Sequence, residues 1–426
     1  MRRLLPLLSV VALGCNPGAF EDFVGAAAER VDDAGQRNED AQVSPAADAA
    51  GVDARVVDAS TVQDARTQDA IVEPTDAEVV DSGPAQPELD SCGQRRPRTQ
   101  LAIADNGVTF AGSIAENPQV QPRWPTSVVA IDQDTWWLFG PAYRPSSVLL
   151  QTTDSITRAP RAMPYALAEA ADAAPAPTPF LPALDVDRAQ LASGEQLVHN
   201  TGNVMLTSER DGLLFYAVGA LGAGLKVRSL GTRLADVHFE GGKATATPRS
   251  ALVLGPTTTP FRHGVLAEGY VYLYGCVQNV FTAYDCVVAR APVAEAGVGA
   301  SYQFRTTGGW SSDYTSATYV ISGARDELSI SFNPFLQRYL AVHLYGIAAQ
   351  LNLSTSRQPD GPWEPLGVIE LPPPEGGQIT HYGGMEQPAL AELCGRKLVL
   401  SYVFGRADNA SELRRIEVLL REEPAP

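Results

Sequence analysis

The chain has 426 residues, of which 45% are apolar, and a formal net charge of −17. This length is ample for a large hydrophobic core. The acidic balance, without any basic stripe interleaved with aromatics, excludes an electrostatic nucleic-acid binder, so we expect no nucleic acid among the partners.

The first fifteen residues resemble a bacterial lipoprotein signal. Residues 1–3 are basic, residues 4–14 form a short apolar run, and small residues precede Cys15. Such a run is too short to cross about 30 Å of hydrocarbon, so a transmembrane anchor is the weaker alternative. We expect residues 1–15 to be the signal peptide with its lipobox and Cys15 to carry the lipid. The chain would then be exported and anchored to the cell envelope, at the outer membrane or the cell surface.

Residues 16–90 have the composition of a solvated linker. Between residues 21 and 90, 18 acidic residues face four Arg and no Lys, and Phe23 is the sole aromatic residue. Asp-Ala recurs about every five residues, which fits neither a helical face nor a strand. A calcium-binding repeat is an alternative, but it would use Gly-rich nonapeptides. The segment cannot bury enough apolar surface to offset chain ordering, so we predict a disordered acidic linker.

Four further cysteines lie in a compartment where disulfides persist. Cys276 and Cys286 flank a short segment between two strand-like runs, so a bridge between them would clamp a hairpin. Cys92 and Cys394 remain as the second pair. Zinc is the alternative, but no ligand spacing typical of zinc occurs. We expect neither a metal nor another cofactor.

From Ser127 onward, short β-rich runs alternate with turn residues. This pattern predicts five hairpins: residues 127–131 with 136–139, 204–207 with 213–218, 264–266 with 270–274, 328–332 with 338–344, and 390–393 with 397–403. Third strands are predicted at residues 225–229, 286–290, 349–355 and 413–420. The best helix candidate is the Ala-rich stretch 165–174, which Pro175 ends.

Five all-β units predict an all-β, five-bladed β-propeller over residues 91–426. Two β-sandwiches in tandem are the alternative, but no linker-like composition divides residues 120–420. Circular closure would also give the Cys92–Cys394 pair a purpose, because the bridge would hold the N-terminal segment against the last blade.

Several short segments share their order and spacing with a known protein family. They are residues 136–140, 270–275, 332–342, 360–363, 400–402 and 412–414. These segments resemble domain-of-unknown-function family 4185, extracellular bacterial propellers that include endo-D-arabinanases. The Asp-Gly-Pro-Trp sequence at residues 360–363 also resembles other five-bladed glycosidase propellers. The resemblance implies the propeller fold and a polysaccharide as partner.

The resemblance also implies two acidic residues in blade one, and both are replaced. Active members begin blade one with an Asp-Gly-Gly turn and place an Asp after Trp-x-Phe-Gly. Here Trp124 or Pro125 and Pro141 stand at those positions. Glycoside hydrolysis normally needs two carboxyl groups, and proline supplies none. We therefore expect a propeller that binds a glycan with little or no hydrolysis.

Loops that converge on the axis carry aromatic, amide and charged side chains suited to a sugar. The residues expected to bind substrate are Trp124, Asn200, Arg262, His263, Trp310 and Glu386. If the chain is an enzyme, a glycoside hydrolase, then Glu386 and Asp313 are the candidate catalytic carboxyls.

Each candidate also has a structural alternative. Trp124 can be a plug, and His199 and His263 can be satisfied hydrogen-bonding residues. Glu386 can cap a turn, and Asp313 can form an Asx-turn. Besides binder and hydrolase, a protein-interaction scaffold of the envelope is a third functional class. We expect the chain to act as a monomer.

Overall fold

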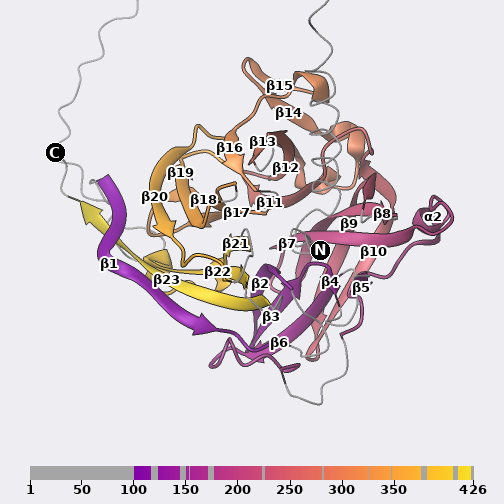
Figure 1. Ribbon diagram of the computed structural model, residues 1–426. Helices are drawn as coiled ribbons and strands as arrows, with labels where there is room; N and C mark the ends of the chain where they lie inside the picture. The colour runs from indigo at the N-terminus through magenta and orange to yellow at the C-terminus, as the bar shows by residue number, and fades with distance from the viewer. Residues whose placement is uncertain are drawn as a thin grey trace, which may run out of the picture. The chain divides into compact units, whose positions relative to one another are not determined.

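The structure is a computed structural model that describes residues 100–423, except 117–122, 144–149, 153, 171–176, 223–225, 281–282, 326, 347, 376–380 and 406–410. The predicted lipid site Cys15, the acidic linker and Cys92 lie outside the described residues. The described part is an all-β, five-bladed propeller, as predicted (Figure 1).

Each blade is an antiparallel sheet with its first strand innermost. Blade one has the order β2 (Pro125–Ile131), β3 (Asp134–Phe139) and β6 (Ser155–Pro160), and a small ribbon of β4 (Ala142–Tyr143) and β5 (Leu150–Thr152) lies in the β3–β6 connection. Blade two has the order β7 (Gln196–Leu206), β8 (Asp211–Leu221), β9 (Val227–Glu240) and β10 (Lys243–Leu254), and the short helix α2 (Asp185–Arg188) precedes it.

Blade three is the largest sheet. It has the order β11 (Phe261–Ala267), β12 (Tyr270–Val280), β13 (Ala283–Pro292), β14 (Gln303–Thr306) and β15 (Gly309–Ser311), and β16 (Ile321–Ala324) also pairs with β13. Blade four has the order β17 (Leu328–Asn333), β18 (Arg338–Leu344), β19 (Gln350–Ser356) and β20 (Glu364–Glu370). The 3-10 turns of blade three are η2 (Val293–Glu295), η3 (Gly299–Ser301) and η4 (Tyr314–Ser316).

Blade five combines the two ends of the described chain. Its order is β21 (Tyr382–Glu386), β22 (Lys397–Gly405), β23 (Ser411–Glu423) and β1 (Gln100–Ser113). In Figure 1 the indigo β1 runs along the yellow β23. The ring therefore closes by pairing the N-terminal strand with the C-terminal strand.

Five clusters of buried apolar side chains fill the five interfaces between neighbouring blades. Strand β12 shows how the sequence supplies them, because successive side chains of a strand point to opposite faces. Tyr272 and Tyr274 pack toward blade four, while Val271 and Leu273 pack toward blade two. Both faces of β12 are thus buried, which is why residues 270–274 form a continuous apolar run.

The inner strands run parallel around the axis and are tied by polar contacts. The backbone N–H of Val204 on β7 donates to Ser127 Oγ on β2 over 3.2 Å. Asn203 exchanges two hydrogen bonds with the backbone of Gly264 on β11, at 2.8 and 2.9 Å. Because all five inner strands run in one direction, the tight hairpins lie at one end of the axis and the connections between blades at the other. We call these the hairpin end and the loop end.

Two local predictions are wrong. The fifth hairpin does not begin with residues 390–393: the inner strand is β21, and the following residues form the 3-10 turns η5 (Pro388–Leu390) and η6 (Leu393–Gly395). Pro388 lacks the N–H that a ladder needs, and Gly383 and Gly384 hid the real strand. The predicted helix at residues 165–174 is a run of turns up to residue 170, and the rest lies outside the described residues.

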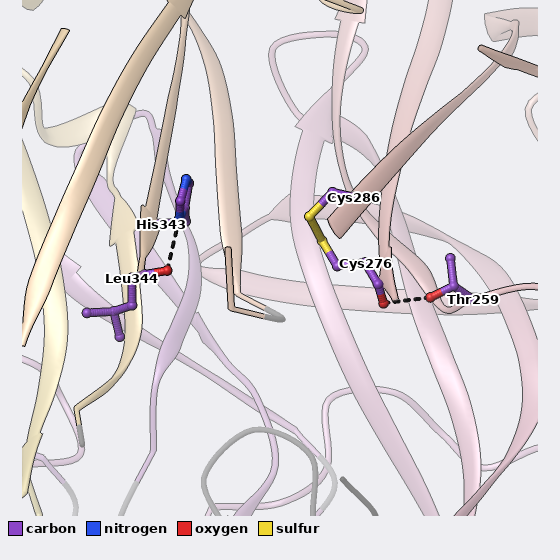
Figure 2. The surroundings of a disulfide bond; sticks show 5 residues. All are labelled: Thr259, Cys276, Cys286, His343 and Leu344. Carbon is purple, nitrogen blue, oxygen red and sulfur yellow. Dashed lines mark hydrogen bonds between the residues drawn. A yellow bond between two sulfur atoms is a disulfide. The ribbon is translucent and has the colours of Figure 1, made fainter. Parts of the chain in front are cut away.

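The Cys276–Cys286 disulfide is present and joins directly paired residues of β12 and β13 (Figure 2). The hydroxyl of Thr259 donates to the Cys276 carbonyl over 2.7 Å, and His343 lies nearby with its Nδ1 2.9 Å from the Leu344 carbonyl. Cys394 is also disulfide-bonded. Its predicted partner, Cys92, lies outside the described residues.

Candidate functional site

The five inner strands enclose an axial cavity of about 340 Å³. Every blade contributes to its lining: Thr126–Ala130 in blade one, Asn203, Val204 and Leu206 in blade two, His263 in blade three, Leu328, Ser329 and Ile330 in blade four, and Glu386–Ala389 in blade five. Small-molecule sites typically measure about 300 to 1,000 Å³. The axis thus holds a space of ligand size, and we take this cavity as the candidate site.

Glu386 is the one carboxyl group among the described residues that line the cavity. It ends β21 and is 3% exposed. Ser331 Oγ donates a 2.5 Å hydrogen bond to Glu386 Oε2, and the backbone N–H of Glu386 donates to Ser329 Oγ over 2.8 Å. Burial raises the pKa of Glu386 to about 7, against a smaller lowering by Ser331. The predicted carboxyl therefore reaches the axis, and its burial favours the protonated form.

His263 and Gln387 bring hydrogen-bonding groups to the same cavity. Burial, helped by the Arg262 charge, lowers the pKa of His263 well below its ordinary range, so the imidazole is neutral at pH 7. Gln387 Nε2 donates to Ser401 Oγ over 2.9 Å. Within the described part of the chain, His263 Nε2 and Gln387 Oε1 are buried without a hydrogen-bond partner. Native proteins rarely leave such groups unsatisfied, so both are candidates for contacts with a ligand.

Two other predicted residues lie nearer the loop end and do not line the cavity. Arg262 is buried on β11, and its carbonyl lies against β7 so closely that a Cβ on Gly202 would come within 1.5 Å of the oxygen. Asn200, on β7, is half-buried, and no hydrogen bond to its Oδ1 is made by the described residues.

Trp124 is packed as a plug between blades one and five. It is 3% exposed, and its ring meets Tyr382 edge to face at 5.9 Å. A Cβ on Gly140 or Gly383 would come within 2.7 or 2.4 Å of Trp124 atoms. The ring is therefore covered by protein, and a sugar could not stack on it without rearrangement.

Trp310 and Asp313 do not line the axial cavity, contrary to the expectation from sequence. Trp310 lies on β15, at the edge of blade three farthest from β11. Asp313 is exposed and caps the following turn: its Oδ1 accepts from the Thr315 N–H over 2.9 Å, and the contacts to Thr315 lower the pKa of Asp313. Neither residue lines the cavity, so Asp313 does not form a carboxyl pair with Glu386.

Glu327 lies at the loop end of blade four and was not among the residues predicted from the sequence. It directly precedes β17 and is 1% exposed. Burial raises the pKa of Glu327 to about 7, although the backbone N–H groups of Glu327 and Gly383 lower it in part. No side chain or other donor among the described residues forms a standard hydrogen bond to either carboxyl oxygen. A signal was available, since an acidic residue stood immediately before a correctly predicted inner strand.

A buried charged cluster stands at the loop end of blade one. The guanidinium of Arg123 is fully buried, lies 4.0 Å from the Phe139 ring centroid, and donates to Ser155 Oγ over 3.0 Å. It also binds Glu116 Oε1 at 3.3 Å and the carboxylate of Glu169. Burial raises the pKa of Glu116 to about 7 even though Arg123 lowers it. The cluster is satisfied internally, which identifies it as a structural element of the loop end.

His199 lies beside the same region, on β7. Burial lowers the pKa of His199 to about 4, so its ring is neutral. Its Nδ1 is 4.0 Å from Asp154 Oδ1, and its ring meets Tyr216 edge to face at 5.1 Å. His199 does not line the axial cavity.

The described residues contain no group of three or more His, Cys, Asp or Glu side chains placed to hold a metal ion. Nor does any helix in this part of the chain combine the length and apolarity required to span a bilayer.

Chemically, the arrangement offers hydrogen-bonding groups and buried carboxyls around the axis. The described cavity lining contains hydroxyl, amide and imidazole groups and a single carboxyl. The described loop end adds Glu327, a buried acid without a standard hydrogen bond to its carboxyl oxygens. Glycosidases of the common kinds need two carboxyl groups about 5 to 5.5 Å or about 6.5 to 9.5 Å apart.

Comparison with known proteins gave one family and several solved structures. No curated protein matches the chain. Similar structures include Zg3597, a family 117 glycoside hydrolase of Zobellia galactanivorans, with 11% identity, TM-score 0.45, and coverage of 75% of this chain and 90% of that chain. A GH43_1 enzyme from Xanthomonas citri has 12% identity, TM-score 0.42, and coverage of 71% and 89%. CoXyl43, a GH43 β-xylosidase/α-arabinofuranosidase from a compost metagenome, has 11% identity, TM-score 0.43, and coverage of 74% and 95%. Within this five-bladed propeller, residues 243–402, from β10 into β22, match the family Domain of unknown function (DUF4185).

Proposed function

We propose that the propeller binds a neutral glycan at its axis and hydrolyses it slowly or not at all. The observation that carries this proposal is the pair of unsatisfied buried atoms, His263 Nε2 and Gln387 Oε1, on residues that line a ligand-sized cavity in the described structure. Sugar hydroxyls both donate and accept hydrogen bonds, so they can satisfy both atoms.

The single carboxyl supports binding over turnover. Glu386 is the sole acid of the described lining, and its Oε2 already accepts from Ser331. A protonated carboxyl can donate to a sugar oxygen but cannot by itself supply both an acid and a base. In blade one, Trp124 or Pro125, and Pro141, stand at the two positions where the resemblance implies acids.

A glycoside hydrolase is the second candidate, and Glu327 is the observation that favours it. A general acid works best when its pKa is near the operating pH, and burial raises the pKa of Glu327 to about 7. Hydrolysis would need a second carboxylate within reach of Glu327. The loop-end acids Glu116 and Glu169 are bound by Arg123.

The test is incubation of the full chain with arabinan and arabinogalactan, followed by reducing-end analysis and affinity electrophoresis. We expect retardation in the gel without release of oligosaccharides, and we expect Gln387→Ala to reduce the retardation. Rapid release that is lost in Glu327→Gln but kept in Asp313→Asn would establish the hydrolase instead. Asp313→Asn is the matched control because Asp313 is an exposed carboxyl away from the axis. Neither retardation nor release on these glycans would favour the interaction scaffold.

We further propose that the protein is exported and lipid-anchored through Cys15, with the acidic linker holding the propeller away from the envelope. The basic start, short apolar run and small residues before Cys15 support this proposal. Cys15→Ala should move the protein from the membrane fraction to the soluble fraction. Equal membrane retention of the variant after a carbonate wash would reject the anchor.

A further inference from the structure

A second aromatic site lies between blades three and four, outside the axial cavity. We define the lateral patch as Tyr270, Arg290, Trp310, Tyr339 and Trp363. All five side chains are partly exposed, and the four aromatic ones pack against the apolar cluster between these blades. None of the five lines the axial cavity. The patch lies toward the hairpin end, because Tyr270 and Tyr339 stand at or near the starts of β12 and β18.

Arg290 lies against two of the aromatic rings of the lateral patch. Its guanidinium carbon lies 4.1 Å from the Trp310 ring centroid and 4.8 Å from that of Tyr270. Trp310 also meets the buried Tyr272 edge to face at 5.9 Å. Arg290 and Tyr272 thus fix the orientation of the indole, while the Trp310 side chain remains partly exposed.

The charges around the patch balance. Arg305 Nε is 2.9 Å from Asp360 Oδ2, and the Arg305 guanidinium carbon lies 6.0 Å from the Trp310 ring centroid. Burial raises the pKa of Tyr272 and Tyr339, and the negative charge of the nearby Glu268 raises both further. Two cations and two anions favour a neutral ligand over a polyanion.

Two buried N–H donors in the lateral patch favour a ligand that carries hydrogen-bond acceptors. Among the described residues, Arg290 Nε and Trp363 Nε1 have no hydrogen-bond partner. Both belong to side chains that are otherwise partly exposed. The oxygens of a sugar ring can accept from such donors while its C–H face stacks on Trp310, whereas an aliphatic peptide side chain offers no acceptor.

We propose that the lateral patch is a second binding site for a neutral oligosaccharide, with Trp310 as its stacking platform. The chemistry required is a sugar with one apolar face and oxygens along its edge. This site does not depend on the function proposed for the axial cavity.

The experiment is isothermal titration calorimetry of the full chain with neutral arabino-oligosaccharides. We expect two sites per chain in the wild type and, in Trp310→Ala, one unchanged site and one that is about threefold to tenfold weaker. If the axial cavity binds nothing, we expect one site in the wild type and a residual affinity in Trp310→Ala that is about threefold to tenfold weaker, the effect of one lost ring contact. Either result supports the lateral site.

The controls separate stacking from folding. Tyr345 is 45% exposed and directly follows β18 at the end opposite Tyr339, so Tyr345→Ala removes a similar exposed ring outside the patch and should change nothing. Trp310→Phe keeps a flat ring and should retain most of the binding. Identical stoichiometry and affinity in the wild type and Trp310→Ala would overturn the proposal, as would the absence of binding in the wild type or equal losses in Trp310→Phe and Trp310→Ala.

Discussion

Ser331 of blade four donates a 2.5 Å hydrogen bond to Glu386 of blade five, inside the ring of inner strands. The contact joins neighbouring blades at the axial cavity and fixes the orientation of the single carboxyl of the described lining. It also leaves that carboxyl in a buried site, where the neutral form is favoured. Binding and folding should therefore both respond to its protonation.

Glu386→Gln should reduce the pH dependence of stability. The folded-state pKa of Glu386 is about 7, above the ordinary value of 4.5, so the folded protein holds a proton that the unfolded chain has lost. The contribution of Glu386 to wild-type stability is accordingly fully present below about pH 4.5 and is lost as the pH rises through 7. A shift of this size corresponds to about 3 kcal/mol, of which Gln, still an acceptor for Ser331, should remove most. Urea unfolding from pH 4.5 to 8 measures the pH dependence of the unfolding free energy in the wild type and in Glu386→Gln. Parallel curves of this free energy against pH would contradict the prediction.

Arg123→Met should destabilise the loop end of blade one. The substitution leaves Glu116 and Glu169 without the buried guanidinium that binds both. Removing one partner of a buried ion pair typically costs about 3 to 5 kcal/mol. Chemical denaturation gives the free energy of unfolding. Arg210→Met is the matched control, because it breaks an exposed pair with Asp132 and should change little; similar losses in both variants would reject the special role of Arg123.

Gly202→Ala should force blades two and three apart. A Cβ at Gly202 would come within 1.5 Å of the Arg262 carbonyl oxygen, and backbone cannot give way as a flexible side chain can. Overpacking of this kind typically costs about 1 to 3 kcal/mol, and a clash with backbone should lie at or above the upper end. Thermal unfolding should show a lower melting temperature than for Gly308→Ala, since a Cβ at Gly308 meets nothing within 4 Å. An unchanged melting temperature in Gly202→Ala would refute the close approach.

The Cys276–Cys286 disulfide should make a modest contribution to stability. It closes a loop over a sequence separation of 10, for which chain-entropy estimates give about 2 to 3 kcal/mol. The hairpin ladder on both sides already pairs β12 with β13, so this figure is an upper value. The double variant Cys276→Ala, Cys286→Ala should lower the free energy of unfolding within that range. A larger loss, or failure to fold, would show that the bridge is required to form blade three.

Local sequence was sufficient to predict the hairpins of most of the blades. Turn residues between apolar runs predicted the hairpins of blades one to four, because hairpin register depends on a few consecutive residues. The fifth failed where glycines concealed β21, and a helix was predicted at residues where the structure has turns up to residue 170. The sequence also predicted the Cys276–Cys286 bridge, since its two residues lie on adjacent strands of one hairpin.

The candidate site depended on contacts that no local pattern contains. Glu386 and His263 were predicted correctly to lie near the axis, whereas Trp310 and Asp313 lie at the outer part of blade three and Glu327 occupies the loop-end position that was missed. Which residues reach the axis depends on which strand of each blade is innermost.

The same reasoning holds for the closure of the ring. The sequence by itself determined the composition of the linker, the strand-and-turn alternation and the identity of the available side chains. Only the tertiary structure decided that β1 pairs with β23 and that five inner strands enclose one cavity. The physical reason is that these pairings join segments about 300 residues apart, where the free energy comes from burying both faces of every blade and not from any local preference.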